Sequence, residues 1–398
     1  MSPLTRVTLK PGREKPVLNR HPWIFSGAIQ RIEGQPTDGE IVQVRDSQGE
    51  FLAWGTLNRR SQITVRLLSW DPDETIDRAL FRRRLEQAIA ARALFVDQEA
   101  TNAYRLVNAE SDLLPGLVVD RYADYLVVQF LTLGMERRKA EIVALLEELI
   151  APRGIYERSD VEVRKKEGLS LSTGLLAGEE PPDRVEVREN GYRFLVDVKR
   201  GQKTGFYLDQ RENRRKVMPY CHGRKVLNAF AYTGAFAVHA AAGGATRITN
   251  VEASAQALEL ARANMALNGF DGREDEYVVG DVFQVLRRYR DQGRTFDLVI
   301  LDPPKFAQTQ SQVQAACRGY KDINLLALRI LRPGGILFTF SCSGLVSPDL
   351  FQKVVFGASV DAGRDVQIIE RLSQGPDHPV LLAFPEGEYL KGLVCRVM

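Results

Sequence analysis

Apolar and polar positions alternate in short runs along the first part of the chain. These runs have the period of two that predicts half-buried β-strands, and turns containing glycine separate them. They cover residues 7–9, 41–44, 51–54 and 63–68. Short strands joined by tight turns are typical of a small β-barrel, so we expect one over residues 1–72.

The next part of the chain mixes two periods. Apolar positions have helical spacing over residues 71–95 and 135–150. Strand-like runs cover residues 104–107, 116–120, 126–130 and 154–156. We therefore expect a compact α+β domain over residues 73–184. A hairpin should follow over residues 185–198, with its turn at an Asn-Gly pair.

From residue 225 onward, strand-like and helical runs alternate. The expected strands cover residues 225–230, 247–251, 277–279, 296–301 and 336–340, and the expected helices cover 235–243 and 254–268. Such alternation predicts an α/β domain built on a parallel, doubly wound sheet. Two more strands, over residues 366–370 and 390–398, should close the sheet as an antiparallel pair. We assign residues 185–398, including the hairpin, to this domain.

Composition allows for this number of domains and hints at a partner. A chain of 398 residues that is 44% hydrophobic and 26% charged has room for several cores. The net charge is only +3, but residues 1–70 carry ten Lys and Arg against six Asp and Glu. This excess indicates a polyanion partner, and an ordinary surface charge is the alternative.

Basic and aromatic residues are interleaved near the N-terminus, and a short basic run follows in the middle domain. The RNA-binding candidates are Arg13, Lys15, Arg20, Trp23, Arg164, Lys165 and Lys166. Taken alone, Trp23 and Phe25 are better explained as core of the barrel, and the run 164–166 as a solvated surface.

Cysteines, histidines and the N-terminal segment exclude several classes of protein. The four cysteines have neither disulfide-like nor zinc-like spacing, and the four histidines are scattered, so we expect no metal site. No signal peptide or apolar run of membrane-spanning length is apparent. We expect a protein of the reducing cytoplasm.

Polar residues end three successive strands of the predicted sheet. Asn228 ends the first strand, Glu252 ends the second, and Asp281 follows the third. Open α/β sheets bind their ligands at the carboxyl ends of the strands, and an acid about 20 residues after the first turn is placed to hold a ribose diol. Each feature alone is also explained by a plain turn or a helix N-cap.

The identity of the cofactor follows from the motifs that are missing from the turn after the first strand. There is no GxGxxG fingerprint and no phosphate-loop lysine, so S-adenosylmethionine is favoured over NAD or ATP. The further candidates for cofactor binding come from this turn, the next strand end and an upstream segment: Phe230, Tyr232, Thr233, Gly234, Asp302, Lys203, Phe206, Asp209 and Arg211. For the upstream segment, an ordinary helix start is the alternative.

Two reactive motifs end the last two parallel strands. Asp302-Pro303-Pro304-Lys305 follows one strand, and Cys342 follows the other between two serines. Carbon 5 of a pyrimidine is a weak nucleophile until a thiolate adds to the neighbouring carbon, and Cys342 fits that task. Asp302 and Pro303 would bind the base. Lys305 would steer phosphate or lower the thiol pKa, and an ordinary exposed lysine is the alternative. The target base must be flipped out or unpaired.

Together these motifs resemble the bacterial ribosomal RNA large subunit methyltransferase I family, the 23S rRNA 5-methylcytosine methyltransferases. The segments that carry the resemblance are residues 12–15, 20–23, 158–160, 164–168, 207–211, 302–306, 317–322 and 340–344. The resemblance implies an N-terminal PUA domain, a central linking domain and a C-terminal class I methyltransferase, with Cys342 as the nucleophile. Related RNA cytosine methyltransferases have a second cysteine where this chain has Lys305, so the group that removes the carbon 5 proton stays open.

The resemblance also implies partners and leaves rivals. The expected partner is 23S rRNA or a precursor of the large ribosomal subunit. We expect no membrane partner, and the oligomeric state stays open, with a homodimer as one option. A guanine-directed rRNA N-methyltransferase is one alternative, and Cys342 argues against it because N-methylation needs no thiol. A non-catalytic RNA-binding assembly factor is the other, and the retained Asn228, Glu252, Asp281 and Cys342 argue against it.

Overall fold

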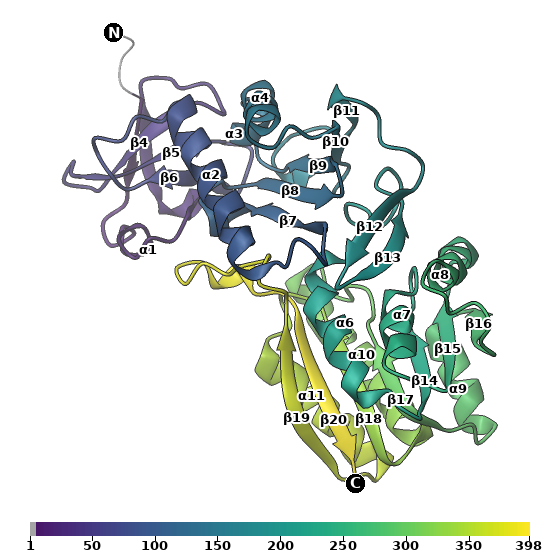
Figure 1. Ribbon diagram of the computed structural model, residues 1–398. Helices are drawn as coiled ribbons and strands as arrows, with labels where there is room; N and C mark the ends of the chain where they lie inside the picture. The colour runs from purple at the N-terminus through teal and green to yellow at the C-terminus, as the bar shows by residue number, and fades with distance from the viewer. Residues whose placement is uncertain (1–4) are drawn as a thin grey trace. The chain divides into compact units, whose positions relative to one another are not determined.

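The computed structural model describes residues 5–398, which form two compact units (Figure 1). The first unit runs to Val187 and also contains Val196–Leu208 and Pro376–Gly387. The second contains Arg188–Leu195, Asp209–Gly375 and Glu388–Met398. The chain therefore passes between the units several times, and the expected domain limit at residue 72 falls inside the first unit.

The N-terminal part of the first unit is a six-stranded sheet. Its strands are Arg6–Leu9 (β1), Trp23–Phe25 (β2), Ile29–Glu33 (β3), Ile41–Arg45 (β4), Phe51–Leu57 (β5) and Ile63–Ser69 (β6), with the short helix Lys15–Leu18 (α1). Their order is β2-β6-β5-β4-β1-β3, and all neighbours are antiparallel except β1 and β4. The four expected strands are confirmed. Strand β2 was not predicted because it has only three residues, and β3 was not predicted because three of its five residues are polar and exposed.

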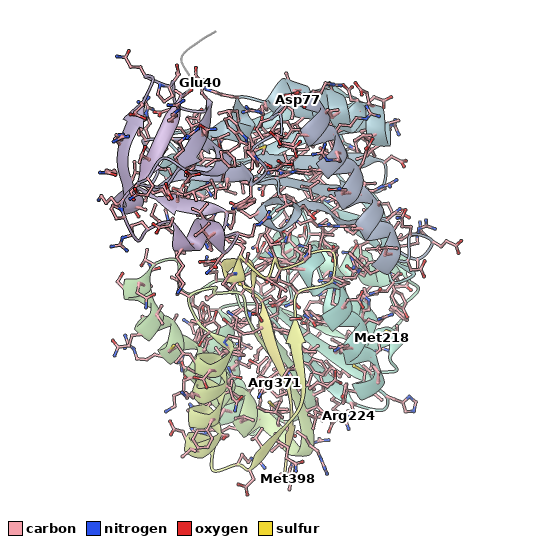
Figure 2. All side chains as sticks on the ribbon, turned by 90° about the vertical axis from the view of Figure 1, so that its left-hand side faces the viewer. Glu40, Asp77, Met218, Arg224, Arg371 and Met398 are labelled. Atoms are coloured by element: carbon pink, nitrogen blue, oxygen red, sulfur yellow. The ribbon has the colours of Figure 1, made fainter. Side chains whose placement is uncertain are left out.

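The rest of the first unit is an α+β layer. Its strands Ala103–Asn108 (β7), Leu117–Tyr122 (β8), Tyr125–Phe130 (β9), Gly154–Ser159 (β10) and Ser172–Gly178 (β11) form a sheet in the order β11-β10-β9-β8-β7. Its helices are Arg78–Phe95 (α2), Leu133–Glu136 (α3), Lys139–Ile150 (α4) and Val163–Lys166 (α5). Asp77 (Figure 2) caps α2 by accepting from the N–H groups of Ala79 and Leu80 at 2.9 and 3.2 Å, so this helix starts later than expected.

A buried ion cluster joins the two parts of the first unit. Arg66 on β6 donates to Glu110 at 3.0 Å and to Glu167 at 2.8 Å. Burial alone would raise the pKa of Glu167, but the Arg66 charge and hydrogen bonds from Ser61 and Asn58 outweigh it and lower that pKa. Removing Arg66 would leave two carboxylates buried without a cation, so the N-terminal sheet is an integral part of this unit.

The second unit contains a seven-stranded sheet. Its strands are Lys225–Ala229 (β14), Arg247–Glu252 (β15), Glu276–Val279 (β16), Phe296–Leu301 (β17), Leu331–Ser341 (β18), Val366–Ser373 (β19) and Lys391–Val397 (β20). The order is β16-β15-β14-β17-β18-β20-β19, with parallel pairing from β16 to β18 and antiparallel pairing for the last two strands. All expected strands and the closing antiparallel pair are confirmed. In Figure 2, Arg371 lies on this closing pair and Met398 follows its end.

Helices cover both faces of this sheet (Figure 1). They are Arg211–Val217 (α6), Ala235–Ala242 (α7), Ala255–Leu267 (α8), Val282–Asp291 (α9), Val313–Ile330 (α10) and Pro348–Ala362 (α11). One group consists of α6, α7 and α8, and the other of α9, α10 and α11, whose apolar side chains pack on β14, β17 and β18. The result is the doubly wound α/β fold that the sequence predicted.

The expected hairpin forms from Val185–Glu189 (β12) and Tyr192–Val196 (β13). A buried charge network holds its turn in the second unit. Arg214 on α6 donates to both carboxylate oxygens of Glu189 at 2.6 and 2.5 Å. His239 on α7 lies 4.0 Å from Glu189, and burial lowers the pKa of this histidine to about 4. The imidazole is therefore neutral near pH 7.

Candidate active site

The candidate active site lies where the strand order of the second unit reverses. Strands β14 and β17 are parallel neighbours. The strands that follow β14 lie toward one edge of the sheet, and those that follow β17 lie toward the other edge. Open α/β sheets bind their ligands at such a switch point, beyond the carboxyl ends of the strands. The turns that follow β14 to β18 all meet this edge.

The turn after β14 has a strained backbone. Phe230 and Tyr232 have φ angles of 60° and 45°, in the left-handed region that residues other than glycine avoid. Gly234 also has a positive φ, of 79°, and a Cβ there would lie 2.8 Å from the Cβ of Ala261 on α8. Strained residues of this kind cluster at binding sites, where the surrounding structure holds them in place.

Glu252, at the end of β15, holds this turn. Its Oε2 accepts from the N–H of Tyr232 at 3.0 Å, and its Oε1 accepts from Ala253 at 2.8 Å and Ser254 at 3.1 Å. Its main-chain oxygen accepts from Gly280 at 3.0 Å, which connects β15 to the turn after β16. Three predicted cofactor-binding segments are thus joined by hydrogen bonds.

Asp281 has a structural task in this arrangement. Its carboxylate caps α9 by accepting from the N–H of Gln284 at 3.0 Å. This is the N-cap role that the sequence also allowed for an acid at this position. The side chain stays exposed at the same edge of the sheet.

Buried polar atoms in this part of the site lack protein partners. Asn228 donates to Asn250 at 2.9 Å, but within residues 5–398 its Oδ1 has no hydrogen-bond partner, and the same holds for the Oγ1 of Thr233. Both side chains are almost fully buried. Buried polar groups are nearly always hydrogen-bonded, so these atoms fit a ligand that carries hydroxyl, amine or carboxylate groups. S-adenosylmethionine carries all three.

Asp302 follows β17 and is oriented by a residue that sequence reasoning left out. The amide of Gln210 donates to Asp302 at 2.8 Å, while its oxygen accepts from Asn213 at 2.6 Å. Two predicted residues flank it: buried Asp209 accepts from the Tyr389 hydroxyl at 2.7 Å, and buried Arg211 pairs with Glu212. Gln210 lies within the segment 203–211, which the sequence analysis had already selected as a candidate for cofactor binding. The position of Gln210 in this segment could therefore have identified it.

The two reactive motifs meet at this edge. Strands β17 and β18 are paired so that Leu301 lies opposite Thr339. The turns that follow therefore bring the Cys342 Sγ to 3.9 Å from the carbonyl oxygen of Pro303. The thiol and the prolyl backbone therefore face one another at this edge of the sheet. Lys305, two residues further on, is exposed.

Tyr320 on α10 joins these two turns from inside the protein. Its hydroxyl lies 3.0 Å from the Ser343 Oγ, which accepts from the N–H of Ala307 at 3.3 Å. Desolvation by burial raises the pKa of Tyr320, so the phenol is neutral near pH 7. Tyr320 belongs to the segment 317–322 that carried the resemblance, although no role was predicted for it.

The other three cysteines are poorly suited to act as nucleophiles. Burial raises the pKa of both Cys221 and Cys395 to about 12, and it also raises the pKa of Cys317. A thiol reacts as its thiolate, so burial makes these three residues less reactive near neutral pH than an unperturbed thiol.

The remaining two cofactor candidates belong to the first unit. Lys203 has a φ of 54°, and its ammonium lies 4.6 Å from the centre of the Tyr207 ring. Phe206 is buried, and its N–H donates to the Tyr122 hydroxyl at 3.2 Å. Thr204, between them, donates to buried Asp120 at 2.7 Å. These hydrogen bonds hold the segment within the first unit.

The RNA-binding candidates fall into two groups. Arg13, Lys15, Arg20 and Lys166 are exposed, and exposed Lys165 pairs with Glu162 at 2.8 Å. Arg164 is only 1% exposed and donates to Glu136 and to the carbonyl oxygens of Ser170 and Phe130. The prediction that Arg164 binds RNA is wrong, because its guanidinium is used inside the protein.

The two aromatic residues near the N-terminus behave differently from the expectation. Trp23 is half-buried, and its indole N–H donates to Glu110 at 2.8 Å while its ring packs on Phe384 at 4.6 Å. Phe25 is 50% exposed, so it does not belong to the core. It lies 6.3 Å from the Trp23 ring.

Two classes of site are not seen in the described part of the chain. Residues 5–398 contain no group of three or more His, Cys, Asp or Glu side chains placed to hold a metal ion. Over the same range, none of the helices has both the length and the apolar character that crossing a bilayer requires.

Comparison with known families agrees with this geometry. The profile of the S-adenosylmethionine-dependent methyltransferase family matches residues 129–394, and that of the PUA-like domain matches residues 7–70. The fold and the site therefore define an S-adenosylmethionine-dependent methyltransferase with an N-terminal PUA-like domain, and S-adenosylmethionine is its cofactor.

Relatives with curated names narrow the assignment of this chain to one family of methyltransferases. A protein named ribosomal RNA large subunit methyltransferase I from Klebsiella pneumoniae (strain 342) is 50% identical over 393 residues, covering 99% of this chain and 98% of the relative. Its namesake from Cronobacter sakazakii (strain ATCC BAA-894) is 51% identical and covers 99% of both chains. The chain belongs to the ribosomal RNA large subunit methyltransferase I family.

Solved structures have the same fold. SMU.776, described as a candidate methyltransferase and crystallised with SAH, has a TM-score of 0.86 at 25% identity, covering 98% of this chain and all of its own. A structure described as a SAM-dependent methyltransferase from Streptococcus mutans has a TM-score of 0.85 at 24% identity, with the same coverage.

Proposed function

We propose that this protein methylates carbon 5 of a cytosine in ribosomal RNA of the large subunit through a covalent adduct with Cys342. The contact between the Cys342 thiol and the Pro303 carbonyl, 3.9 Å apart, carries this proposal. It unites a nucleophile with main-chain and carboxylate acceptors at the edge of a methyltransferase sheet. The names of the full-length relatives support ribosomal RNA as the substrate.

In this mechanism the Cys342 thiolate forms a bond to carbon 6 of the ring, and the double bond between carbons 5 and 6 is lost. Carbon 5 then carries the electron pair that accepts the methyl group, which bound S-adenosylmethionine supplies. Loss of the carbon 5 proton expels the thiolate and restores the double bond. Asp302, oriented by Gln210, would accept from the amino group of the cytosine and share a proton with its ring nitrogen, with the Pro303 carbonyl as a further acceptor.

The remaining residues of the site are proposed to bind the cofactor. Asn228 and Thr233 offer buried polar atoms, and Glu252 and the strained turn of Phe230 and Tyr232 form the pocket wall. Gly234 permits the close packing of α7 on α8. Asp281, Asp302, Asp209 and Arg211 stay proposed contacts of this pocket. Lys203 and Phe206 stay proposed cofactor contacts as well.

The proposed substrate surface is smaller than the sequence suggested. Arg13, Lys15, Arg20, Lys165 and Lys166 remain proposed contacts for the RNA backbone. Trp23 stays a proposed contact through its half-buried ring, because its indole N–H is already bonded to Glu110. We further propose residues 1–72, 73–184 and 185–398 as the functional segments of an enzyme that acts in the cytoplasm.

Trapping with a modified substrate tests the mechanism. RNA that carries 5-fluorocytosine at the target should become covalently attached to the protein in the presence of S-adenosylmethionine, because fluorine cannot leave as a proton does. Cys342→Ser should bind RNA and cofactor yet lose turnover by orders of magnitude, since a hydroxyl is far less ionised than a thiol. Cys317→Ser is the matched control and should be trapped as well as the wild type.

Two results would contradict the proposal. Full methylation activity in Cys342→Ser would exclude the thiol from the reaction. Mass spectrometry that finds the methyl group on guanosine rather than on cytidine would favour an N-methyltransferase, for which no nucleophile is needed.

A further inference from the structure

A buried lysine lies beside the turn that carries Cys342. Lys391 begins β20, and the antiparallel register places it opposite Ser341 on β18. Its ammonium donates to the carbonyl oxygens of Ser343 at 2.7 Å and Val346 at 2.6 Å. Both oxygens belong to the turn that follows Cys342, so this cation is fixed under the turn.

The surroundings keep this charge nearly dry and without a bonded carboxylate. Lys391 is 5% exposed, and over residues 5–398 the hydrogen bonds of its ammonium go to these two main-chain oxygens. Desolvation by burial is the largest effect on it and lowers the pKa of Lys391 to about 8. The ammonium form therefore still prevails at pH 7. A negative charge on Cys342 favours that form, as does Glu388, and Lys305 opposes it.

We propose that Lys391 is a positioning residue that stabilises the thiolate form of Cys342. The proposal rests on the proposed function, in which this thiolate is the nucleophile. Attraction between two charges is mutual, so a thiolate that favours the ammonium is itself favoured by it. The two carbonyl contacts prevent the ammonium from leaving the turn, which distinguishes it from a mobile surface lysine.

Burial distinguishes Lys391 from the other charged groups named around it. The charge of Lys305 also acts on Lys391, but Lys305 is exposed, where water and salt screen its charge. The attraction between two charges is roughly four times stronger at an effective dielectric constant of about 20 than in bulk water. Tyr320 is neutral near pH 7, and the carboxylates of Asp302 and Glu388 can only raise the thiol pKa.

The rate of thiol alkylation as a function of pH tests this inference without RNA or cofactor. Iodoacetamide reacts with thiolates, and peptide mass spectrometry identifies Cys342 among the four cysteines. In Lys391→Met, which replaces the ammonium by an apolar group of similar length, we expect the pH midpoint for Cys342 to rise by about one unit or more. The rate at pH 7 should then fall roughly tenfold.

Lys305→Met is the matched control, because it removes the exposed cation near the same thiol. We expect its midpoint to move by less than half as much. An unchanged midpoint in Lys391→Met, or an equal or larger shift in Lys305→Met, would overturn the assignment. Thermal melting of both variants shows whether the fold is retained.

A measurement on the wild type covers the case in which Lys391→Met does not fold. Raising the salt concentration from about 0.05 to 1 M shortens the Debye length from more than 10 Å to about 3 Å. The midpoint should stay nearly constant if a buried cation sets it, and a large upward shift would assign it to Lys305 instead. Alkylation reports only on the thiol, so this inference can fail while 5-fluorocytosine trapping succeeds, and the reverse.

Discussion

Replacement of Glu252 should weaken S-adenosylmethionine binding by an amount that the structure allows us to work out. Each carboxylate oxygen has two lone pairs. The Oε1 of Glu252 uses both for Ala253 and Ser254, whereas Oε2 accepts from Tyr232 alone among the donors of residues 5–398. One acceptor position on Oε2 is thus left for a ligand hydroxyl. The three N–H groups fix the orientation of the carboxylate before the ligand binds.

One hydrogen bond to a charged group contributes about 1.5–3 kcal/mol. Glu252→Ala should therefore raise the Kd for S-adenosylmethionine roughly 10- to 150-fold. The upper end applies if Tyr232, released from its acceptor, also leaves the strained conformation with a φ of 45°. Isothermal titration calorimetry measures the change directly.

Glu259→Ala is the matched control for this experiment. Glu259 is an exposed glutamate on α8, the helix that follows Glu252, so its removal should leave the Kd unchanged. If Glu252→Ala binds the cofactor within twofold of the wild type, with an unchanged melting temperature, the carboxylate does not contact the ligand and the pocket must be placed elsewhere.

Two further predictions concern stability and substrate binding. Burial lowers the pKa of His239 to about 4, below the value of about 6.5 in an unfolded chain, so its contribution to stability is complete above pH 6.5 and is lost as the pH falls through 4. Urea unfolding followed by circular dichroism should show a loss of up to about 3 kcal/mol over this range that is smaller in His239→Gln and unchanged in His222→Gln, which alters an exposed histidine. If the exposed cations of the N-terminal sheet bind RNA, the double variant Arg13→Gln, Lys15→Gln should bind RNA more weakly and reduce the slope of log K against log salt by roughly 0.7–0.9 per lost phosphate contact. Binding isotherms at several salt concentrations measure this slope, and an unchanged slope would remove these side chains from the interface.

Point substitutions suit the RNA experiment better than deletion of residues 1–72. Arg66, which such a deletion would remove, neutralises the buried carboxylates of Glu110 and Glu167. Removing one partner of a buried ion pair typically costs about 3–5 kcal/mol. A truncated protein that lost RNA binding would therefore report on unfolding as much as on recognition.

The central strands β14, β17 and β18 were predictable because they are largely buried on both faces. Continuous apolar runs such as residues 298–301 are typical of such strands. The amphipathic helices α9, α10 and α11 were missed, although α9 has a clear start signal in Asp281. That acid was interpreted first as a ligand of the cofactor, and its alternative interpretation as an N-cap was not extended to a helix after it.

Residues whose side chains donate to main-chain carbonyl oxygens were harder to predict. Arg164 looks like part of a basic surface run, and nothing local distinguishes it from Lys165. Its acceptors are Glu136 and two carbonyl oxygens, and the carboxylate is 28 residues away in the sequence. Burial of such a guanidinium depends on tertiary contacts that sequence periodicity does not encode.

Cys342 and Lys391 illustrate the same limit within the candidate active site. The sequence predicted that β18 and the C-terminal strand lie in one sheet, which the structure confirms. It did not predict the register that sets Lys391 opposite Ser341, and a slip by one residue would turn the ammonium to the other face of the sheet. A thiol and a buried cation that are 49 positions apart in the chain therefore become neighbours only through the pairing of two strands. Any substitution that shifts this pairing should change the reactivity of Cys342, even where the substituted residue does not contact the thiol.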